Sequence, residues 1–178
     1  MVKTSAMPSY WLMKSEPGVF SIDDLARAKD GTTRWDGVRN YQARNMLRNE
    51  IAVGDGVLFY HSSADPPAVA GTASVARGGY PDPTQFDPRD SHFDRESLRD
   101  DPRWYAVDIK FESKFAREVT LPELRGARSL AEMELLRRGN RLSVQRVTPG
   151  QWKQILKMGA KAEAKTGSKT GSTKGGKA

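Results

Sequence analysis

Between Trp35 and Arg48 the chain reads WDGVRNYQARNMLR. These fourteen residues combine two aromatic rings, three amides, one carboxylate and three arginines. An aromatic face can stack on a nucleobase, amides can read its edge, and guanidinium groups can hold its phosphate. The run therefore favours a protein that captures a flat polar ligand such as a nucleobase, and little else in the chain resembles reaction chemistry.

The second half of this run has helical periodicity. Ala43, Met46 and Leu47 lie at i, i+3 and i+4, so a helix over residues 40–49 would bury them on one face. Arg44 and Arg48 form a second stripe, also four residues apart. Trp35 precedes the helix in a turn-like segment beside glycine, and core packing and a stacking role are equally compatible with that position.

Working outward, the remaining pattern predicts short strands and short helices. Ser21 followed by Asp24 forms a capping box for one helix, and Thr148-Pro149 begins the last one. The proline- and aspartate-rich residues 78–102 read as a long surface excursion. We expect strands over residues 9–14, 57–61, 68–76, 104–112 and 142–147, and helices over 21–26, 121–125, 129–138 (capped by Ser129) and from 149 onward. This order predicts an α+β domain on a small, mixed, barrel-like sheet.

Length and composition fit one soluble domain. The chain has 178 residues, 37% of them hydrophobic, and a mean hydropathy of -0.67. We expect an N-terminal extension over residues 1–8, one domain over 9–159, and a disordered Lys/Gly/Ser/Thr tail over 160–178. The tail holds five lysines and one glutamate, so much of the net charge of +7 lies there. Long-range attraction to polyanions should therefore come largely from the tail.

The sequence lacks the residues that several classes of chemistry require. The chain has no cysteine, which excludes disulfides, thiolate metal sites and a cysteine nucleophile and fits a cytoplasmic protein. His61 and His92 are its two histidines and form no metal-binding pair, so we expect neither metal nor cofactor. No segment resembles a signal peptide or a membrane span. A triad of His61 with Ser62 or Ser63 is disfavoured because sequence neighbours rarely reach that geometry. Because no catalytic motif is present, we expect that the protein is not an enzyme.

Some candidate residues have ordinary structural explanations. Trp11, Trp104 and Trp152 sit in amphipathic strands or a helix, where burial in the core is the default. Lys14, Ser15 and Glu16 would be solvated on spacing alone. Arg39, Arg44 and Arg48 could pair with the acidic residues Asp23, Asp24 or Glu50.

Seven runs, taken in order, resemble the EVE-domain family. They are Tyr10–Pro17, Phe20–Leu25, Trp35–Asn45, Phe59–Ser62, Tyr80–Asp82, Val107-Asp108 and Arg141–Gln145. The resemblance implies a PUA-like fold, that is, a small twisted β-barrel with flanking helices. It also implies a non-catalytic pocket for a modified base, such as a modified cytosine or adenine.

Carried onto this chain, the resemblance places the base-binding pocket in five segments. Its predicted residues are Trp11, Lys14, Ser15, Glu16, Trp35, Asp36, Val38, Arg39, Asn40, His61, Ser62, Tyr80, Asp82, Arg141, Ser143 and Gln145. Arg39 and Arg44 are the predicted phosphate contacts, with Lys14 as a further cation. Arg146 stands where the family pattern leads us to expect proline, which could alter the rim of the pocket.

The leading hypothesis is a nucleic-acid-binding module, for DNA or RNA, that reads a modified base in an aromatic and polar pocket. An alternative is an enzyme acting on a modified nucleoside or nucleotide, with Glu16 or Asp36 as general base and His61 as acid. A third hypothesis is a protein-interaction scaffold.

Overall fold

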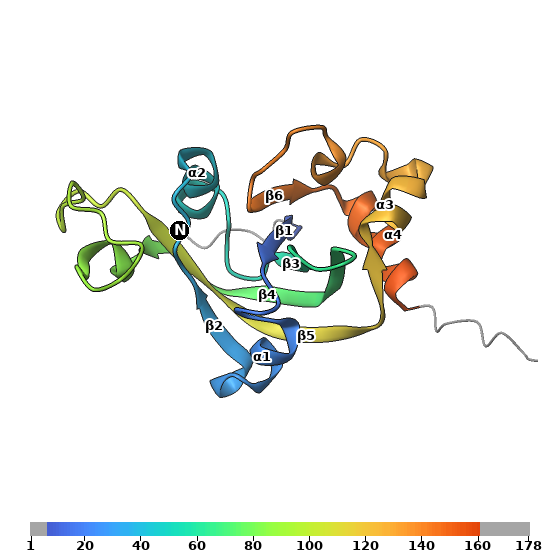
Figure 1. Ribbon diagram of the computed structural model, residues 1–178, viewed down its shortest axis with the longest axis horizontal. Coiled ribbons are helices and arrows are strands. Elements are labelled where there is room, and N and C mark those ends of the chain that lie inside the picture. Colours follow the sequence, from blue (N-terminus) through green and yellow to red (C-terminus); the bar gives the residue numbers. More distant parts are fainter. Residues whose placement is uncertain (1–6, 161–178) are drawn as a thin grey trace, which may run out of the picture.

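The computed structural model describes residues 7–160, which form a mixed six-stranded sheet flanked by four α-helices (Figure 1). The strands are β1 (Tyr10–Ser15), β2 (Thr32–Trp35), β3 (Gly56–His61), β4 (Ala68–Pro81), β5 (Tyr105–Thr120) and β6 (Val144–Val147). The helices are α1 (Ile22–Arg27), α2 (Tyr41–Asn49), α3 (Leu121–Gly126) and α4 (Pro149–Gly159). A single α+β domain is therefore confirmed. The tail predicted to be disordered lies outside the described residues, apart from Ala160.

The strand order in the sheet is β2-β5-β4-β3-β1-β6. β1 runs parallel to β3, and every other neighbouring pair is antiparallel. β4 and β5 run well beyond the predicted 68–76 and 104–112, and several register shifts interrupt their pairing. Such shifts bend a strand pair. Within residues 7–160 the edge strands β2 and β6 are not paired with each other, so the closed barrel stays a prediction.

Local chemistry accounts for most helix boundaries. Ser21 caps α1 and forms the predicted capping box with Asp24, and Thr148 caps α4 in the same way with Gln151. The side chain of Asn40 caps α2 by accepting the N–H of Ala43. The predicted caps at Ser21 and Thr148 are confirmed, whereas the cap at Asn40 was not predicted. α1 ends at Arg27 and is followed by a 3₁₀ turn over Lys29–Gly31.

The helix predicted over residues 129–138 is wrong. The chain there makes two 3₁₀ turns, Arg128–Leu130 and Glu134–Leu136, and neither has a side-chain cap. The buried side chains are Leu130, Met133 and Leu135, whose spacing does not follow one stripe of an α-helix. Ser129 is therefore not a helix cap, because the chain turns to bury these residues instead.

A hydrophobic core lies on each face of the sheet. Strand alternation separates them, since Met13 and Phe59 enter one core while Leu12 and Leu58 enter the other. The first core includes the buried faces of α1 and α2, and the second includes those of α3 and α4. Figure 1 shows α2 at the opposite end of the sheet from α3 and α4. No helix in residues 7–160 is long and apolar enough to cross a membrane.

Candidate functional site

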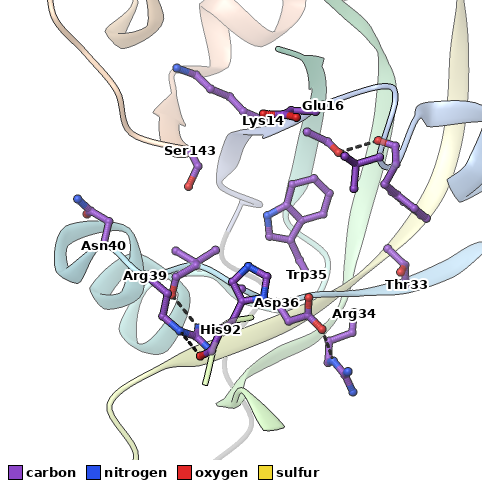
Figure 2. A pocket seen from close by; sticks show the side chains of 15 residues that line it. Lys14, Glu16, Thr33, Arg34, Trp35, Asp36, Arg39, Asn40, His92 and Ser143 are labelled. Atoms are coloured by element: carbon purple, nitrogen blue, oxygen red, sulfur yellow. Dashed lines mark hydrogen bonds and ion pairs between the residues drawn. The ribbon is translucent and has the colours of Figure 1, made fainter. Parts of the chain in front are cut away.

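A cavity of about 780 Å³ opens where β1 and β2 end beside the start of α2 (Figure 2). This volume falls within the ~300–1,000 Å³ usual for small-molecule sites. The lining comes from the end of β1 and the following turn, from β2 and the segment leading to α2, and from two distant residues. It comprises Lys14, Ser15, Glu16, Val19, Phe20, Thr33, Arg34, Trp35, Asp36, Gly37, Val38, Arg39, Asn40, His92 and Ser143.

Trp35 forms a wall of this cavity and also belongs to the core. It is the last residue of β2, is 9% exposed, and packs edge-to-face on Phe59 with ring centroids 5.6 Å apart. Its indole N–H has no hydrogen-bond partner within residues 7–160, and this nitrogen is not among the buried unpaired atoms. Figure 2 shows the nitrogen on the side of the ring that faces Ser143 and Asn40. Trp35 is therefore a core residue that also lines the cavity, and its role as a stacking platform stays a prediction.

The floor of the cavity is held by a buried carboxylate. Asp82 is fully buried and accepts hydrogen bonds from the backbone N–H of Gly37 (2.9 Å), from Arg39 Nη1 (2.9 Å) and from both the N–H and the hydroxyl of Thr84. Burial alone would raise the pKa of Asp82, but these hydrogen bonds outweigh it and hold the pKa below its ordinary value. Asp82 is therefore ionised at neutral pH and fixes the segment that lines the cavity.

Gly37 occupies a position that glycine alone suits. Its φ is +74°, and a Cβ built there would lie 2.8 Å from Nε2 of His92. The imidazole of His92 thus packs directly over the bend, and Figure 2 shows it beneath Trp35. A larger residue would be strained in this conformation and would displace the ring.

Arg39 lines the cavity, but its guanidinium is already occupied. Nε and Nη2 both donate to the carbonyl of His92, Nη1 donates to Asp82, and Nη2 also reaches the hydroxyl of Thr84. The side chain therefore joins the cavity floor to the excursion after β4. The predicted phosphate contact of Arg39 stays a prediction, but the geometry does not favour it, because the guanidinium donors have partners within the protein.

The cavity carries uncommitted hydrogen-bonding groups on several sides. The Asn40 carbonyl oxygen caps α2, but its amide nitrogen has no partner within the described chain, and neither has the hydroxyl of Ser143. The backbone of Lys14 donates to the carbonyl of Ser143 at 2.9 Å, which fixes the two segments side by side. Burial lowers the pKa of the half-buried Lys14 ammonium. Glu16 is exposed at the rim.

Ser15 and Asp36 also line the cavity, but their side chains serve neighbouring groups. The hydroxyl of Ser15 donates to the carbonyl of Phe20 at 2.6 Å, which closes the turn after β1. Asp36 pairs with Arg34 at 2.7 Å on the solvent side. The groups best placed to meet a ligand are therefore the indole N–H of Trp35, the amide of Asn40 and the hydroxyl of Ser143.

Trp11 and His61 do not line the cavity. The indole N–H of Trp11 donates to the buried carboxylate of Asp55 at 2.9 Å, within the core. His61 is 7% exposed, and its Nε2 accepts the N–H of Ile22, the first residue of α1. Burial lowers the pKa of His61, opposed in part by Glu118, so the ring is held neutral. These two predicted pocket residues are structural supports.

Ser62 and Tyr80 also fall outside the lining. Ser62 follows β3, and its backbone N–H donates to the carbonyl of Ser15. The hydroxyl of Tyr80 donates to Asp108 at 2.5 Å, in a separate open groove that shares Thr33 and Arg34 with the cavity. Burial, followed by the hydrogen bond to Asp108, raises the pKa of Tyr80. Both residues lie in segments that support the cavity without facing it.

The predicted residues around β6 divide in the same way. Ser143 lines the cavity, whereas Gln145 is buried and its amide nitrogen donates to the carbonyl of Leu142 and to Asn140. Arg141 is exposed and does not line the cavity. Gln145 therefore holds the turn that presents Ser143.

Arg44 and Arg146 bind partners that the sequence did not indicate. Arg44 donates to the carbonyl of Arg103, and Arg146 forms a bidentate pair with Glu50 away from the cavity. Asp23 and Asp24, the other acids considered, pair with Lys114 and Arg27. Arg146 therefore does not alter the rim of the cavity.

Sequence reasoning left out several lining residues. They are Val19, Phe20, Thr33, Arg34, Gly37 and His92. Thr33 and Arg34 were missed because β2 was not recognised, and the alternation of Thr32–Trp35 is too short to stand out. His92 lies in the excursion, where no periodicity indicates which part folds back. Within residues 7–160 no cluster of three or more potential ligands could hold a metal ion.

Together these features define a small α+β domain with a concave pocket bounded by an indole and by polar donors that have no partner within residues 7–160. The chain belongs to the EVE-domain family, because the EVE domain pattern matches residues 9–158. It is similar to thymocyte nuclear protein 1 from Danio rerio (42% identity over 170 residues) and from Homo sapiens (40% over 169). Each alignment covers 85% of this chain, and 73% and 74% of the relatives respectively.

Solved structures agree with this assignment. A crystal structure of a Pseudomonas putida protein is 47% identical and superposes with a TM-score of 0.81, covering 85% of this chain and 99% of that one. The crystal structure of human THYN1 protein in complex with 5-methylcytosine containing DNA is 40% identical with a TM-score of 0.80, covering 86% and 98%. The resemblance predicted from the sequence motifs is thus confirmed.

Proposed function

We propose that this chain is a nucleic-acid-binding module whose cavity accepts a modified base, with 5-methylcytosine in DNA as the first candidate. The observation that carries the proposal is the cavity beside Trp35, where an accessible indole meets unpaired donors from Asn40 and Ser143. The human relative crystallised with 5-methylcytosine-containing DNA supports this choice of ligand.

The chemistry of the lining suits a cytosine ring. Its edge presents a carbonyl oxygen and a ring nitrogen that accept hydrogen bonds, and an exocyclic amine that donates. The donors of Trp35, Asn40 and Ser143 match the acceptors, and the carboxylate of Glu16 matches the amine. Val38 and the neighbouring Val19 and Phe20 supply apolar surface for a methyl group. A base would enter unpaired or flipped out of its stack, as in other proteins that act on single bases.

Selectivity would come from the cost of leaving buried polar groups unpaired. A base with the wrong edge would desolvate Trp35 and Ser143 without giving them partners, which costs more than a missing apolar contact. The methyl group would add only a modest gain, because one methylene-sized group contributes about 1–3 kcal/mol. We therefore expect strong discrimination between base types and a smaller preference for the methylated base.

We further propose that the module is non-catalytic. The enzyme hypothesis required His61 to act as an acid beside Glu16 or Asp36, but His61 lies outside the cavity and its Nε2 is committed to Ile22. Incubation with a panel of modified nucleosides, followed by mass spectrometry, separates the two hypotheses, since turnover would favour an enzyme. Co-purification of a fixed protein partner without nucleic acid would favour the scaffold hypothesis.

The direct test is a titration with duplexes that differ in one base. We expect tighter binding when a central cytosine carries a 5-methyl group, and a preference that persists as salt is raised. Equal binding to all duplexes, dependent only on salt concentration, would refute the proposal that the cavity binds a base. RNA oligonucleotides with the same modification establish whether the polymer matters.

A further inference from the structure

The exposed face of α2 carries a repeated Arg-Asn pair. Nε of Arg44 donates to the side-chain oxygen of Asn45 at 2.8 Å, and Nε of Arg48 donates to that of Asn49 at 3.1 Å. The two pairs are separated by four residues, which is about one helical turn or ~6 Å along the axis. Each amide therefore orients the guanidinium beside it in the same way.

Each guanidinium also lies over an aromatic ring. Arg44 lies 5.0 Å from the ring centroid of Tyr41, and Arg48 lies 5.6 Å from that of Tyr105. Tyr41 in turn stacks on the buried Trp104 with centroids 5.0 Å apart. A charged group supported on a ring and bonded through Nε loses little further freedom when its terminal nitrogens bind an anion.

Within residues 7–160 no carboxylate neutralises these two arginines. α2 contains no acidic residue, and neither Arg44 nor Arg48 forms an ion pair with any residue between 7 and 160. The nearby Glu50 is committed to Arg146. Two like charges four residues apart on a helix repel each other, and an anion bound between them would relieve this repulsion. Nη1 of Arg44 donates to the carbonyl of Arg103, but Nη2 of Arg44 and both terminal nitrogens of Arg48 have no partner in the same range.

The location connects this face to the cavity. α2 begins directly after Asn40, which lines the cavity, and Arg44 and Arg48 follow along the helix away from it. We propose that Arg44 and Arg48, termed here the arginine ladder, bind successive phosphates of the strand that flanks the base in the cavity. This inference rests on the proposed function for its choice of polyanion. Arg44 was already a predicted phosphate contact and would bind through Nη2, which has no partner within residues 7–160. Arg48 is a phosphate contact that the sequence did not predict.

The test is the salt dependence of DNA binding by Arg44→Gln, Arg48→Gln and the double variant. Each lost phosphate contact lowers the slope of log K against log salt concentration by about 0.9, so the double variant should lose about 2. The matched control is Arg125→Gln on α3, an exposed arginine at the other end of the sheet in Figure 1, whose slope should equal that of the wild type. Arg44→Gln also removes a hydrogen bond to a backbone carbonyl and could disturb the fold. Arg48→Gln has no such side effect, so this variant alone must lower the slope by about 1.

The probe is a pair of duplexes with cytosine or 5-methylcytosine at one position. Loss of the ladder in the double variant should weaken binding to both duplexes equally and leave their affinity ratio unchanged. A double variant with the slope of the Arg125→Gln control would overturn the ladder. If the wild type showed no preference between the duplexes but the double variant still had a smaller slope, the base-binding pocket would be refuted and the arginine ladder supported.

Discussion

The carboxylate of Asp82 accepts the backbone N–H of Gly37 at 2.9 Å across 45 residues of sequence. This bond, with the ion pair from Asp82 to Arg39, joins the segment that lines the cavity to the excursion after β4. The residue predicted as a base contact is therefore the support beneath the contacts. The shape of the pocket depends on a charge that no ligand would touch.

Removing this charge should destabilise the protein. Asp82→Ala would leave the partly buried Arg39 unpaired and the N–H of Gly37 unsatisfied, and we expect a loss of about 3 kcal/mol in the free energy of unfolding. Urea denaturation measures the loss. Asp87→Ala is the control, because Asp87 pairs with the exposed Arg89 and should leave stability unchanged. Equal, negligible effects of both substitutions would refute the role of Asp82.

The bend at Gly37 should depend on its contact with His92. Gly37→Ala places a Cβ against the imidazole and in a positive φ, so we expect a loss of about 1–2 kcal/mol in stability. Adding His92→Ala should recover the part due to the steric contact but not the part due to backbone strain. Thermal unfolding of both single variants and the double variant provides the comparison. Simple additivity of the two losses would show that the residues do not interact.

Stability should fall below neutral pH because of His61. Its folded pKa is lowered by burial, so the unfolded chain takes up a proton first as pH falls through about 6.5. The native state is then penalised progressively until the folded pKa is reached. We expect the wild type to lose more stability between pH 7.5 and 5 than His61→Gln does. Parallel pH profiles for the two proteins would contradict this.

Trp35→Phe separates the proposed contact of Trp35 with the base from its packing in the core. A phenyl ring retains most packing on Phe59 but lacks the indole N–H and the larger face. We expect modest destabilisation, below about 1.5 kcal/mol, and roughly tenfold weaker binding of the methylated duplex, since base stacking contributes ~1–3 kcal/mol. Trp152→Phe is the control, because Trp152 stacks on Tyr10 outside the cavity. Equal affinities of the two variants would argue against any contact between Trp35 and the base.

Much of the architecture followed from local sequence signals. The apolar stripe of Ala43, Met46 and Leu47 became the buried face of α2, and the capping boxes at Ser21 and Thr148 set two helix starts. Each signal acts within four residues, which is why it can be read from one chain. The helix expected over 129–138 failed because burial of residues in the second core overrode its local pattern.

The cavity was only partly predictable for the opposite reason. Lys14, Trp35, Asn40 and Ser143 converge as the motifs implied, but their convergence depends on strand pairings distant in sequence. His92 enters through hydrogen bonds between its carbonyl and Arg39 that no spacing reveals. The sequence also does not indicate whether a polar residue of a motif points into the cavity or into the protein. Asp82 and Gln145 were predicted in the pocket, but both are buried and bond to neighbouring protein groups.

The most direct measurement is the ¹H–¹⁵N spectrum of the four indole groups during titration with a duplex carrying 5-methylcytosine. Trp11 has its N–H bonded to Asp55 within the core and Trp152 stacks on Tyr10 outside the cavity, so these two serve as internal references. We predict that the Trp35 indole resonance shifts in proportion to bound DNA, and shifts less with the unmethylated duplex. Saturating binding that leaves the Trp35 resonance in place would contradict entry of a base into this cavity.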